Sequence, residues 1–284
     1  MIVVTGATGQ LGRIVVTDLL ERGVEPGRIV AAVRTPEKAA DLAARGVDVR
    51  EADYDRPDTL ETALHGAERV LLISSNAVGQ RLAQHRAVIE AATRVGVGLL
   101  AYTSVLRADT SALPVAPDHR ATEELIRGSG LPFALLRNGW YTENYTGNLA
   151  AALTHGAVLG AARQGRIAAA TRADLAAAAA AVLTGSGHTD TVYELGGEPF
   201  TMADLAAEIT RQSGTPVAYR DLPVQEYQAA LVGAGLPEPF ARLLADSDAA
   251  AAEGALDTDR EDLARLLGRP ATPLADAVAT ALKG

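Results

Sequence analysis

A strand, a glycine-rich turn and a helix follow one another at the start of the chain, and this order constrains the fold more than any other feature. Ile2–Thr5 is an apolar run typical of a buried strand, and Gly9–Arg22 has the apolar spacing of a helix. In such a turn, Gly6 permits a tight exit from the strand, Gly9 lets phosphates approach the backbone, and Gly12 lets helix and strand pack closely. Because a helix N-terminus attracts anions, the pattern predicts a dinucleotide pyrophosphate here. The residues expected to hold it are Gly6, Thr8, Gly9, Gln10, Leu11 and Gly12.

Apolar runs alternate with helical patterns as far as about Leu136. The predicted strands are Ile2–Thr5, Ile29–Val33, Val47–Glu51, Val70–Ser74, Leu99–Thr103 and Phe133–Arg137. The predicted helices between them are Gly9–Arg22, Pro36–Arg45, Asp58–Leu64, Gly79–Val95 and Asp118–Gly128. Short apolar strands that alternate with helices indicate βαβ units and a parallel sheet covered on both faces. The sequence therefore predicts an α/β fold of the Rossmann type, with a doubly wound parallel sheet.

The alternation weakens after Arg137. We expect an irregular segment with one helix over residues 139–171, a helix at Arg172–Leu183, and short strands at Val192–Leu195 and Val217–Asp221. Thr201 is expected to cap a further helix. The predicted organisation is a dinucleotide-binding domain over residues 1–137 and a smaller, mostly helical substrate-binding region over residues 138–284, which walls the ligand cleft.

Composition excludes several classes of function. The formal charge of −9 argues against nucleic acid, because phosphate contacts need a clustered basic surface. The chain has no cysteine, and its five histidines lack metal-ligand spacing, so no metal is predicted; His119 aside, the histidines are expected at the surface or at helix caps. No basic secretory segment opens the chain, and Ala173–Leu183, its most apolar stretch, is too short to span a membrane. We expect a cytoplasmic protein without nucleic acid or membrane partners.

Two basic residues after the second predicted strand bear on cofactor choice. Arg34 directly follows that strand, where an acidic residue would bind the ribose hydroxyls of NADH and an arginine suits the 2′-phosphate of NADPH. Lys38, one turn further on, adds a second positive charge. The alternative is a solvated surface arginine. We favour NADPH.

Polar residues follow the next three strands at the same edge of the sheet. Asp53 is a candidate for the adenine amino group, or else an ordinary loop aspartate. Ser74, Ser75, Thr103 and Ser104 are expected to line the ribose and nicotinamide, although small polar residues are equally common in turns.

The chain lacks the tyrosine–lysine pair of many short-chain dehydrogenases, in which the lysine lies four residues after the tyrosine and lowers its pKa. None of the seven tyrosines is followed by a lysine at that spacing, and Lys38 and Lys283 are the only lysines. A carbonyl–alcohol dehydrogenase of that kind is therefore not expected. His119 lies in the region where the pair would be sought, and nothing in the sequence requires a flavin.

Several segments together resemble a known family. They are residues 6–12 (GATGQLG), 119–123 (HRATE), 137–145 (RNGWYTENY), 236–240 (LPEPF), 244–248 (LADSD) and 267–270 (LGRP). With them the chain resembles, over its full length, the NmrA-like atypical short-chain dehydrogenases, in particular the quinone oxidoreductase type 2 group and its triphenylmethane reductase relatives. The glycine motif is specific only to a superfamily, whereas the 137–145 block and the tail are much more specific.

The resemblance implies direct hydride transfer from NADPH to a quinone or another conjugated acceptor. A quinone needs little acid catalysis, which fits the missing lysine. Asn138, Tyr141 and His119 are then the candidate donors near the nicotinamide, and Trp140 and Tyr145 could sandwich a flat ring, unless Trp140 and Tyr141 only pack the domain junction. The family also contains NADP(H)-binding redox sensors that do no chemistry, which is the alternative function. A homodimer is left open.

Overall fold

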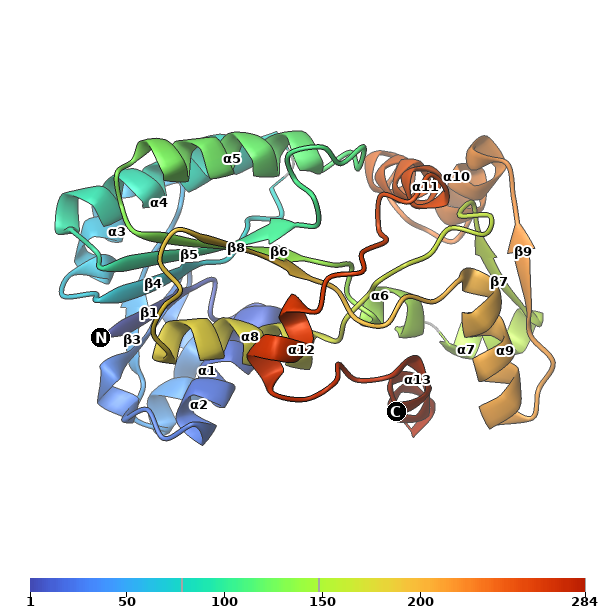
Figure 1. Cartoon of the computed structure of the whole chain (residues 1–284), viewed down its shortest axis with the longest axis horizontal. Coiled ribbons are helices and arrows are strands. Elements are labelled where there is room, and N and C mark those ends of the chain that lie inside the picture. Colours follow the sequence, from blue (N-terminus) through green and yellow to red (C-terminus); the bar gives the residue numbers. More distant parts are fainter. Residues whose placement is uncertain (78, 148, 284) are drawn as a thin grey trace.

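The computed structural model describes residues 1–77, 79–147 and 149–283, which form two adjoining parts (Figure 1). The larger part is built on a seven-stranded sheet in the order β3-β2-β1-β4-β5-β6-β8, in which every pairing is parallel. Its strands are β1 (Ile2–Thr5), β2 (Ile29–Val33), β3 (Asp48–Glu51), β4 (Arg69–Leu72), β5 (Leu99–Val105), β6 (Phe133–Asn138) and β8 (Thr191–Leu195). The predicted doubly wound α/β fold is confirmed.

Helices cover both faces of this sheet, so both faces are buried (Figure 1). One face carries α3 (Pro57–Leu64), α4 (Arg81–Val95) and α5 (Ala116–Gly128). The other carries α1 (Gln10–Glu21), α2 (Ala40–Ala44), α8 (Arg172–Thr184) and α12 (Asp262–Leu267), and the short 3-10 turns η1 (Pro26–Arg28) and η2 (Pro36–Ala39) flank β2. Successive residues of a strand point to opposite faces, so Val3 belongs to one apolar core and Val4 to the other. Burial on both sides explains why the strands are almost continuously apolar.

Two elements that follow residue 138 return to the larger part. β8 pairs with β6 and extends the sheet, while α8 packs on α1. The alanine-rich surface of α8 has small side chains, which allows the two helices to approach closely. Asp174, fully buried in its first turn, accepts hydrogen bonds from Arg269 at 2.6 Å and from the Thr272 amide at 2.7 Å. The predicted boundary at residues 137 and 138 therefore does not separate the two parts cleanly.

The smaller part lies beyond the carboxyl ends of the strands, at the right of Figure 1. Its elements are α6 (Glu143–Thr146), α7 (Leu149–His155), β7 (Ala157–Gly160), α9 (Met202–Ser213), β9 (Ala218–Asp221), α10 (Val224–Gly233), α11 (Glu238–Ala252) and α13 (Leu274–Lys283). The capping role of Thr201 is confirmed, because its side chain accepts from the Asp204 amide and Asp204 accepts from the Thr201 amide. β7, in the segment expected to be irregular, pairs in parallel with β9.

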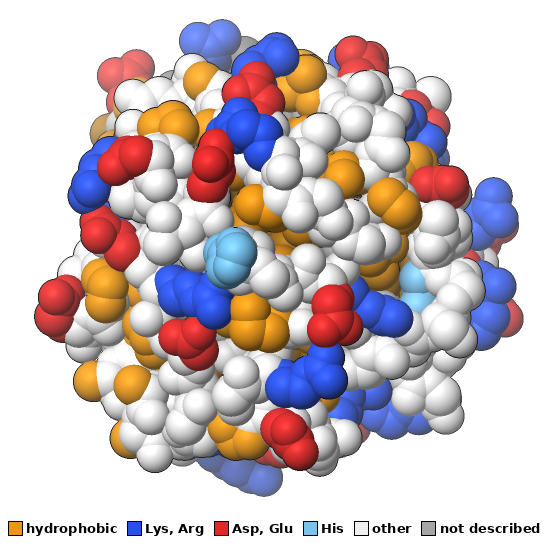
Figure 2. Space-filling model, turned by 90° about the vertical axis from the view of Figure 1, so that its left-hand side faces the viewer, with side chains coloured by type: hydrophobic (Ala, Val, Ile, Leu, Met, Phe, Trp, Pro, Cys, Tyr) orange, Lys and Arg blue, Asp and Glu red, His pale blue; other side chains and the backbone are white. Residues whose placement is uncertain are grey.

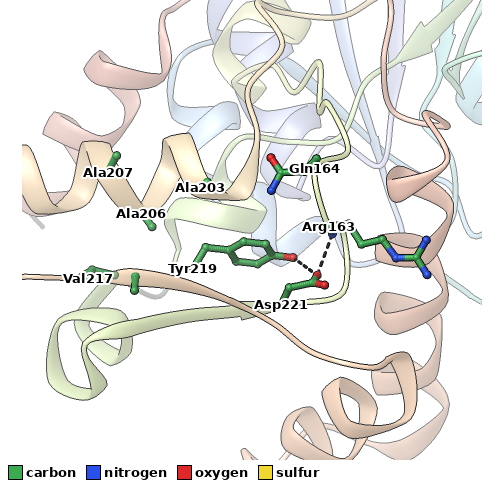
Figure 3. Close-up of a pocket in the computed structure, with 9 residues that line it drawn as sticks. Arg163, Gln164, Ala203, Ala206, Ala207, Val217, Tyr219 and Asp221 are labelled. Carbon is green, nitrogen blue, oxygen red and sulfur yellow. Dashed lines mark hydrogen bonds between the residues drawn. The ribbon is translucent and has the colours of Figure 1, made fainter.

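The corner after β7 is held by two side chains of β9 (Figure 3). The Ala162 amide donates to the Tyr219 hydroxyl at 3.0 Å, and the Arg163 amide donates to the Asp221 carboxylate at 2.9 Å. Tyr219 also donates to Asp221 at 2.8 Å. These contacts fix Arg163 in a left-handed conformation, with φ of 49°, beside a shallow hollow of about 470 Å³ between α9 and β9.

One face of the molecule carries side chains of both charges. On the face at the left of Figure 1, acidic and basic side chains lie interspersed (Figure 2). None of the helices in the described residues is long and apolar enough to cross a membrane.

Candidate active site

The glycine turn between β1 and α1 forms a cradle that only glycine can complete. Gly6 has φ of +59°, a left-handed conformation, and the Gly9 amide donates to its carbonyl oxygen at 2.9 Å. A Cβ on Gly12 would collide with that carbonyl oxygen and lie 2.8 Å from the Ala7 Cα. No side chain caps α1 and no acidic residue lies in its first turn, so the amides at its N-terminus are available to an anion.

A cleft of about 900 Å³ begins at this turn and follows the carboxyl ends of the strands. It lies where the strand order reverses between β1 and β4, the usual position of a ligand in an open α/β sheet. All the site residues predicted from the sequence line the cleft except Tyr145. The structure thus brings these residues together, while the role of each stays a prediction.

Tyr145 lies outside the cleft lining. Its ring packs edge-on against Phe200, with centroids 5.7 Å apart, and its enclosed hydroxyl has no hydrogen-bond partner among the described residues. Trp140 lines the cleft and also packs on the core of the smaller part, so both interpretations of it retain support. Phe240 of α11, half exposed, is an aromatic cleft residue that the sequence reasoning missed. No local signal marks it, since α11 reaches the cleft only through the tertiary fold.

At the β2 end of the cleft, two cations are left without partners. Among the described residues, the side chains of Arg34 and Lys38 make neither a hydrogen bond nor an ion pair, and both line the cleft. Arg13 is instead neutralised by Asp41, and it donates to the Lys38 carbonyl oxygen at 2.9 Å, which holds the turn in place. Arg34 and Lys38 are thus available to a phosphate.

Asp53 serves its own loop as well as lining the cleft. Its carboxylate accepts from the Asp55 amide at 3.1 Å, and its amide donates to the Thr59 hydroxyl at 2.9 Å. The structure therefore supports the loop interpretation of Asp53 without removing it from the wall.

The polar residues that follow β4 and β5 are bonded into the wall of the cleft. The Thr103 hydroxyl accepts from the Ser74 amide at 2.8 Å, and the Ser75 hydroxyl donates to Gln84 at 2.5 Å. The Ser104 hydroxyl donates to Glu123 at 2.6 Å. These hydrogen bonds hold the wall of the cleft in place, whether or not the residues also contact a ligand.

Behind Ser104 lies a buried ion pair that the sequence reasoning did not find. Arg137 donates to both oxygens of Glu123, at 2.9 and 2.7 Å, and both side chains are nearly inaccessible. Arg137 also contacts Glu194 at 2.9 Å and Asp109 at 3.1 Å. Burial alone would lower the pKa of Arg137, but Glu123 and Glu194 outweigh it and raise the pKa. The pair fixes the end of β6 next to Asn138.

His119, at the start of α5, reaches the cleft from a buried position. Burial, together with the charge of Arg81 and the neighbouring His85, lowers its pKa to about 3, so the imidazole is neutral at physiological pH. Its Nδ1 lies 2.8 Å from the hydroxyl of Tyr102, a fully buried residue of β5. His85 of α4, expected at the surface or at a cap, is instead fully buried behind these two residues. No local signal marks this burial, because the neighbours of His85, Tyr102 of β5 and Thr122 of α5, lie far along the chain.

Two more donors lie beside His119 in the cleft. Asn138 is 6% exposed; its Oδ1, an acceptor, has no partner among the described residues, and its Nδ2 is the atom that can donate. Burial raises the pKa of Tyr141, outweighing Arg172 and Asn138, so the phenol stays protonated. The Arg172 guanidinium lies over the Tyr141 ring at 4.3 Å and fixes its plane.

Residues 6–186 match the model of a family described as NAD(P)H-binding. The chain belongs to this NAD(P)H-binding family. Quinone oxidoreductase 2 of Escherichia coli is 52% identical to this family member, over 98% of this chain and 97% of the relative. A crystal structure of an NADPH-dependent quinone oxidoreductase from Escherichia coli with NADPH matches with a TM-score of 0.97 and 51% identity, covering 99% of this chain and all of the other.

A second solved structure is nearly as similar. The triphenylmethane reductase of Citrobacter sp., complexed with NADP(H), matches with a TM-score of 0.95 and 39% identity, covering 99% of this chain and all of that one. The glycine cradle and the two unpartnered cations fit the dinucleotide that gives the NAD(P)H-binding family its description.

Proposed function

We propose that the protein is an NADPH-dependent oxidoreductase that transfers a hydride directly to a quinone or a similar conjugated acceptor. One observation carries this proposal: a single cleft joins a phosphate-binding turn to an end lined by hydrogen-bond donors, aromatic rings and Arg172. The 52% identity to quinone oxidoreductase 2 over nearly the whole chain supports the same activity.

The cofactor end is assigned by charge. The amides at the N-terminus of α1 bind the pyrophosphate, and Arg34 and Lys38 bind the 2′-phosphate that distinguishes NADPH from NADH. When bound, the nicotinamide supplies the hydride.

The acceptor end is assigned by its donors. Hydride addition leaves negative charge on a quinone oxygen, and His119, Tyr141 and Asn138 stabilise that charge with hydrogen bonds from neutral groups. The overall change is NADPH, a proton and a quinone giving NADP⁺ and a hydroquinone, with the proton drawn from water. Trp140 and Phe240 supply apolar surface for a flat ring, in place of the pairing with Tyr145.

The experiment mixes purified protein with NADPH and either 1,4-benzoquinone or a 1,4-naphthoquinone, and follows the absorbance of NADPH at ~340 nm. The proposal expects saturable oxidation of NADPH above the uncatalysed rate. Tight binding of NADPH with no turnover for any acceptor would instead support the alternative, a redox sensor.

We further propose that the protein works in the cytoplasm with a small-molecule partner. Its formal charge of −9 and the mixed charges in Figure 2 support this choice over nucleic acid. The division into a cofactor domain and a substrate region, with β8 and α8 assigned to the former, remains part of the proposal. A homodimer is the assembly to be tested, by light scattering at several protein concentrations.

A further inference from the structure

A chain of hydrogen bonds runs behind the acceptor end of the cleft. The Ser75 amide donates to His85 Nε2 at 2.9 Å. On the other side of the ring, His85 Nδ1 lies 2.9 Å from the Thr122 hydroxyl and 3.5 Å from the Tyr102 hydroxyl. The Thr122 hydroxyl donates to the Asp118 carbonyl oxygen at 2.8 Å.

These contacts determine where the protons lie. A backbone amide can only donate, so His85 Nε2 must be an unprotonated acceptor. Burial and the charge of Arg81 lower the pKa of His85 to about 3, so its ring holds a single proton, which is then on Nδ1. That proton is donated to Thr122, whose own proton is directed to Asp118.

The proton of Tyr102 is assigned from the distances to its neighbours. The nearest partner of its hydroxyl is His119 Nδ1 at 2.8 Å, whereas His85 Nδ1 lies at 3.5 Å, and the side chains of Ser74 and Thr122 are further hydrogen-bond partners. Since His85 Nδ1 already carries a proton and His119 Nδ1 is the nearest acceptor, we assign the Tyr102 proton to the bond with His119 Nδ1. With this assignment the neutral His119 ring carries its proton on Nε2, and the only hydrogen bond of the ring to another described residue is the one at Nδ1.

We propose that His85 and Tyr102 are positioning residues that hold His119 in the Nε2–H tautomer, so that His119 donates a hydrogen bond to the oxygen of the acceptor. This inference rests on the proposed function, which supplies the acceptor. His119 touches the acceptor, whereas His85 and Tyr102 act through it. In this arrangement His119 donates a hydrogen bond but keeps its proton. The proton that completes the hydroquinone comes from water.

The direct test is the tautomer of each ring in the wild-type protein. Long-range ¹⁵N–¹H correlation spectra at neutral pH distinguish Nδ1–H from Nε2–H, and the variants His85→Gln and His119→Gln assign two of the five histidines. We expect opposite tautomers in neighbouring rings, Nδ1–H for His85 and Nε2–H for His119. An Nδ1–H tautomer at His119, or an Nε2–H tautomer at His85, overturns the inference. This measurement needs neither a quinone nor a destabilising variant.

The second test measures the effect on catalysis. Tyr102→Phe is expected to lower kcat with a 1,4-naphthoquinone about tenfold, the loss that follows removal of one hydrogen bond of ordinary strength. The Kd for NADPH should stay unchanged, and the Nδ1 resonance of His119 should shift. The matched control is Tyr193→Phe, because Tyr193 lies 2.7 Å from His188 Nδ1 in a second tyrosine–histidine pair outside the cleft lining. Equal kcat values for the two variants would overturn the positioning role.

The outcomes separate this inference from the function on which it rests. Wild-type turnover of quinones together with the wrong tautomers rejects the inference alone. The expected tautomers without any quinone turnover reject the proposed function, and with it the catalytic role of the His85–Tyr102 pair.

Discussion

His119 keeps one charge state throughout the range in which most histidines titrate. Its pKa is lowered to about 3, so the ring is neutral above that pH and remains a hydrogen-bond donor. We therefore expect kcat/KM for a quinone to show no histidine ionisation between about pH 5 and pH 8. The measurement is a pH profile of kcat/KM at saturating NADPH. A limb with a midpoint near ~6.5, present in the wild type and absent in His119→Gln, would contradict a neutral donor.

Arg34 is the residue on which cofactor choice depends. Loss of its charge-assisted bonds to the 2′-phosphate should cost about 1.5–3 kcal/mol, which raises the Kd for NADPH roughly ten- to a hundredfold in Arg34→Ala. The Kd for NADH should change little. The matched control is Arg86→Ala, an exposed arginine of α4 outside the cleft lining. Titration of cofactor fluorescence gives the constants, and equal losses for NADPH and NADH would remove Arg34 from this role.

The Glu123–Arg137 pair is the residue-scale feature with the largest expected effect on folding. Glu123→Gln leaves a buried guanidinium with fewer countercharges, so we expect the free energy of unfolding to fall by about 3 kcal/mol. Glu61→Gln, which breaks an exposed pair with Arg94, should cost less than about 1 kcal/mol. Urea denaturation of both variants is the measurement. Similar losses would mean that Glu194 and Asp109 alone suffice to neutralise Arg137.

At the scale of elements, the sequence predicts those that depend on neighbouring residues and misses those that depend on contacts with distant parts of the chain. The strands up to β6 were predictable because strands buried on both faces require apolar runs that are visible locally. β7 was missed because it is stabilised by pairing with β9, a strand far along the chain. The position of Tyr145 was likewise set by packing on Phe200, which a local motif does not encode. The glycine cradle was predictable because its constraint is steric and local.

The α10–α11 hairpin carries the aromatic residue that Tyr145 was expected to provide. Phe240→Ala removes apolar surface from the acceptor end, so we expect the KM for a 1,4-naphthoquinone to rise about fivefold, with the Kd for NADPH unchanged. Val232→Ala is the matched control, because Val232 is an exposed apolar residue of the same hairpin outside the cleft lining. Steady-state kinetics with both variants decides the point. An unchanged KM in Phe240→Ala would leave Trp140 as the aromatic surface for the acceptor.

At the scale of the whole molecule, the chain crosses between the two parts more than once. After β6 it forms the smaller part, returns to add α8 and β8 to the larger one, and then leaves again for α9 (Figure 1). The cleft takes residues from both parts, Arg34 from one and Phe240 from the other. A ligand that fills the cleft therefore contacts both parts, which the chain connects several times. Its binding should stabilise the whole fold and not one part alone.

This coupling predicts a cofactor-dependent thermal stability. A ligand at a hundred times its Kd stabilises the native state by about 2.7 kcal/mol, which for a chain of this size corresponds to an increase in Tm of roughly 5–10 °C. We expect NADPH to produce this shift at lower concentration than NADH, because Arg34 and Lys38 have a phosphate to bind only in NADPH. Differential scanning calorimetry across a concentration series of each cofactor gives the comparison, with Arg34→Ala as the variant in which the difference between the cofactors should shrink. Two separate transitions, of which NADPH moves only the one belonging to the larger part, would show that the cofactor does not couple the two parts.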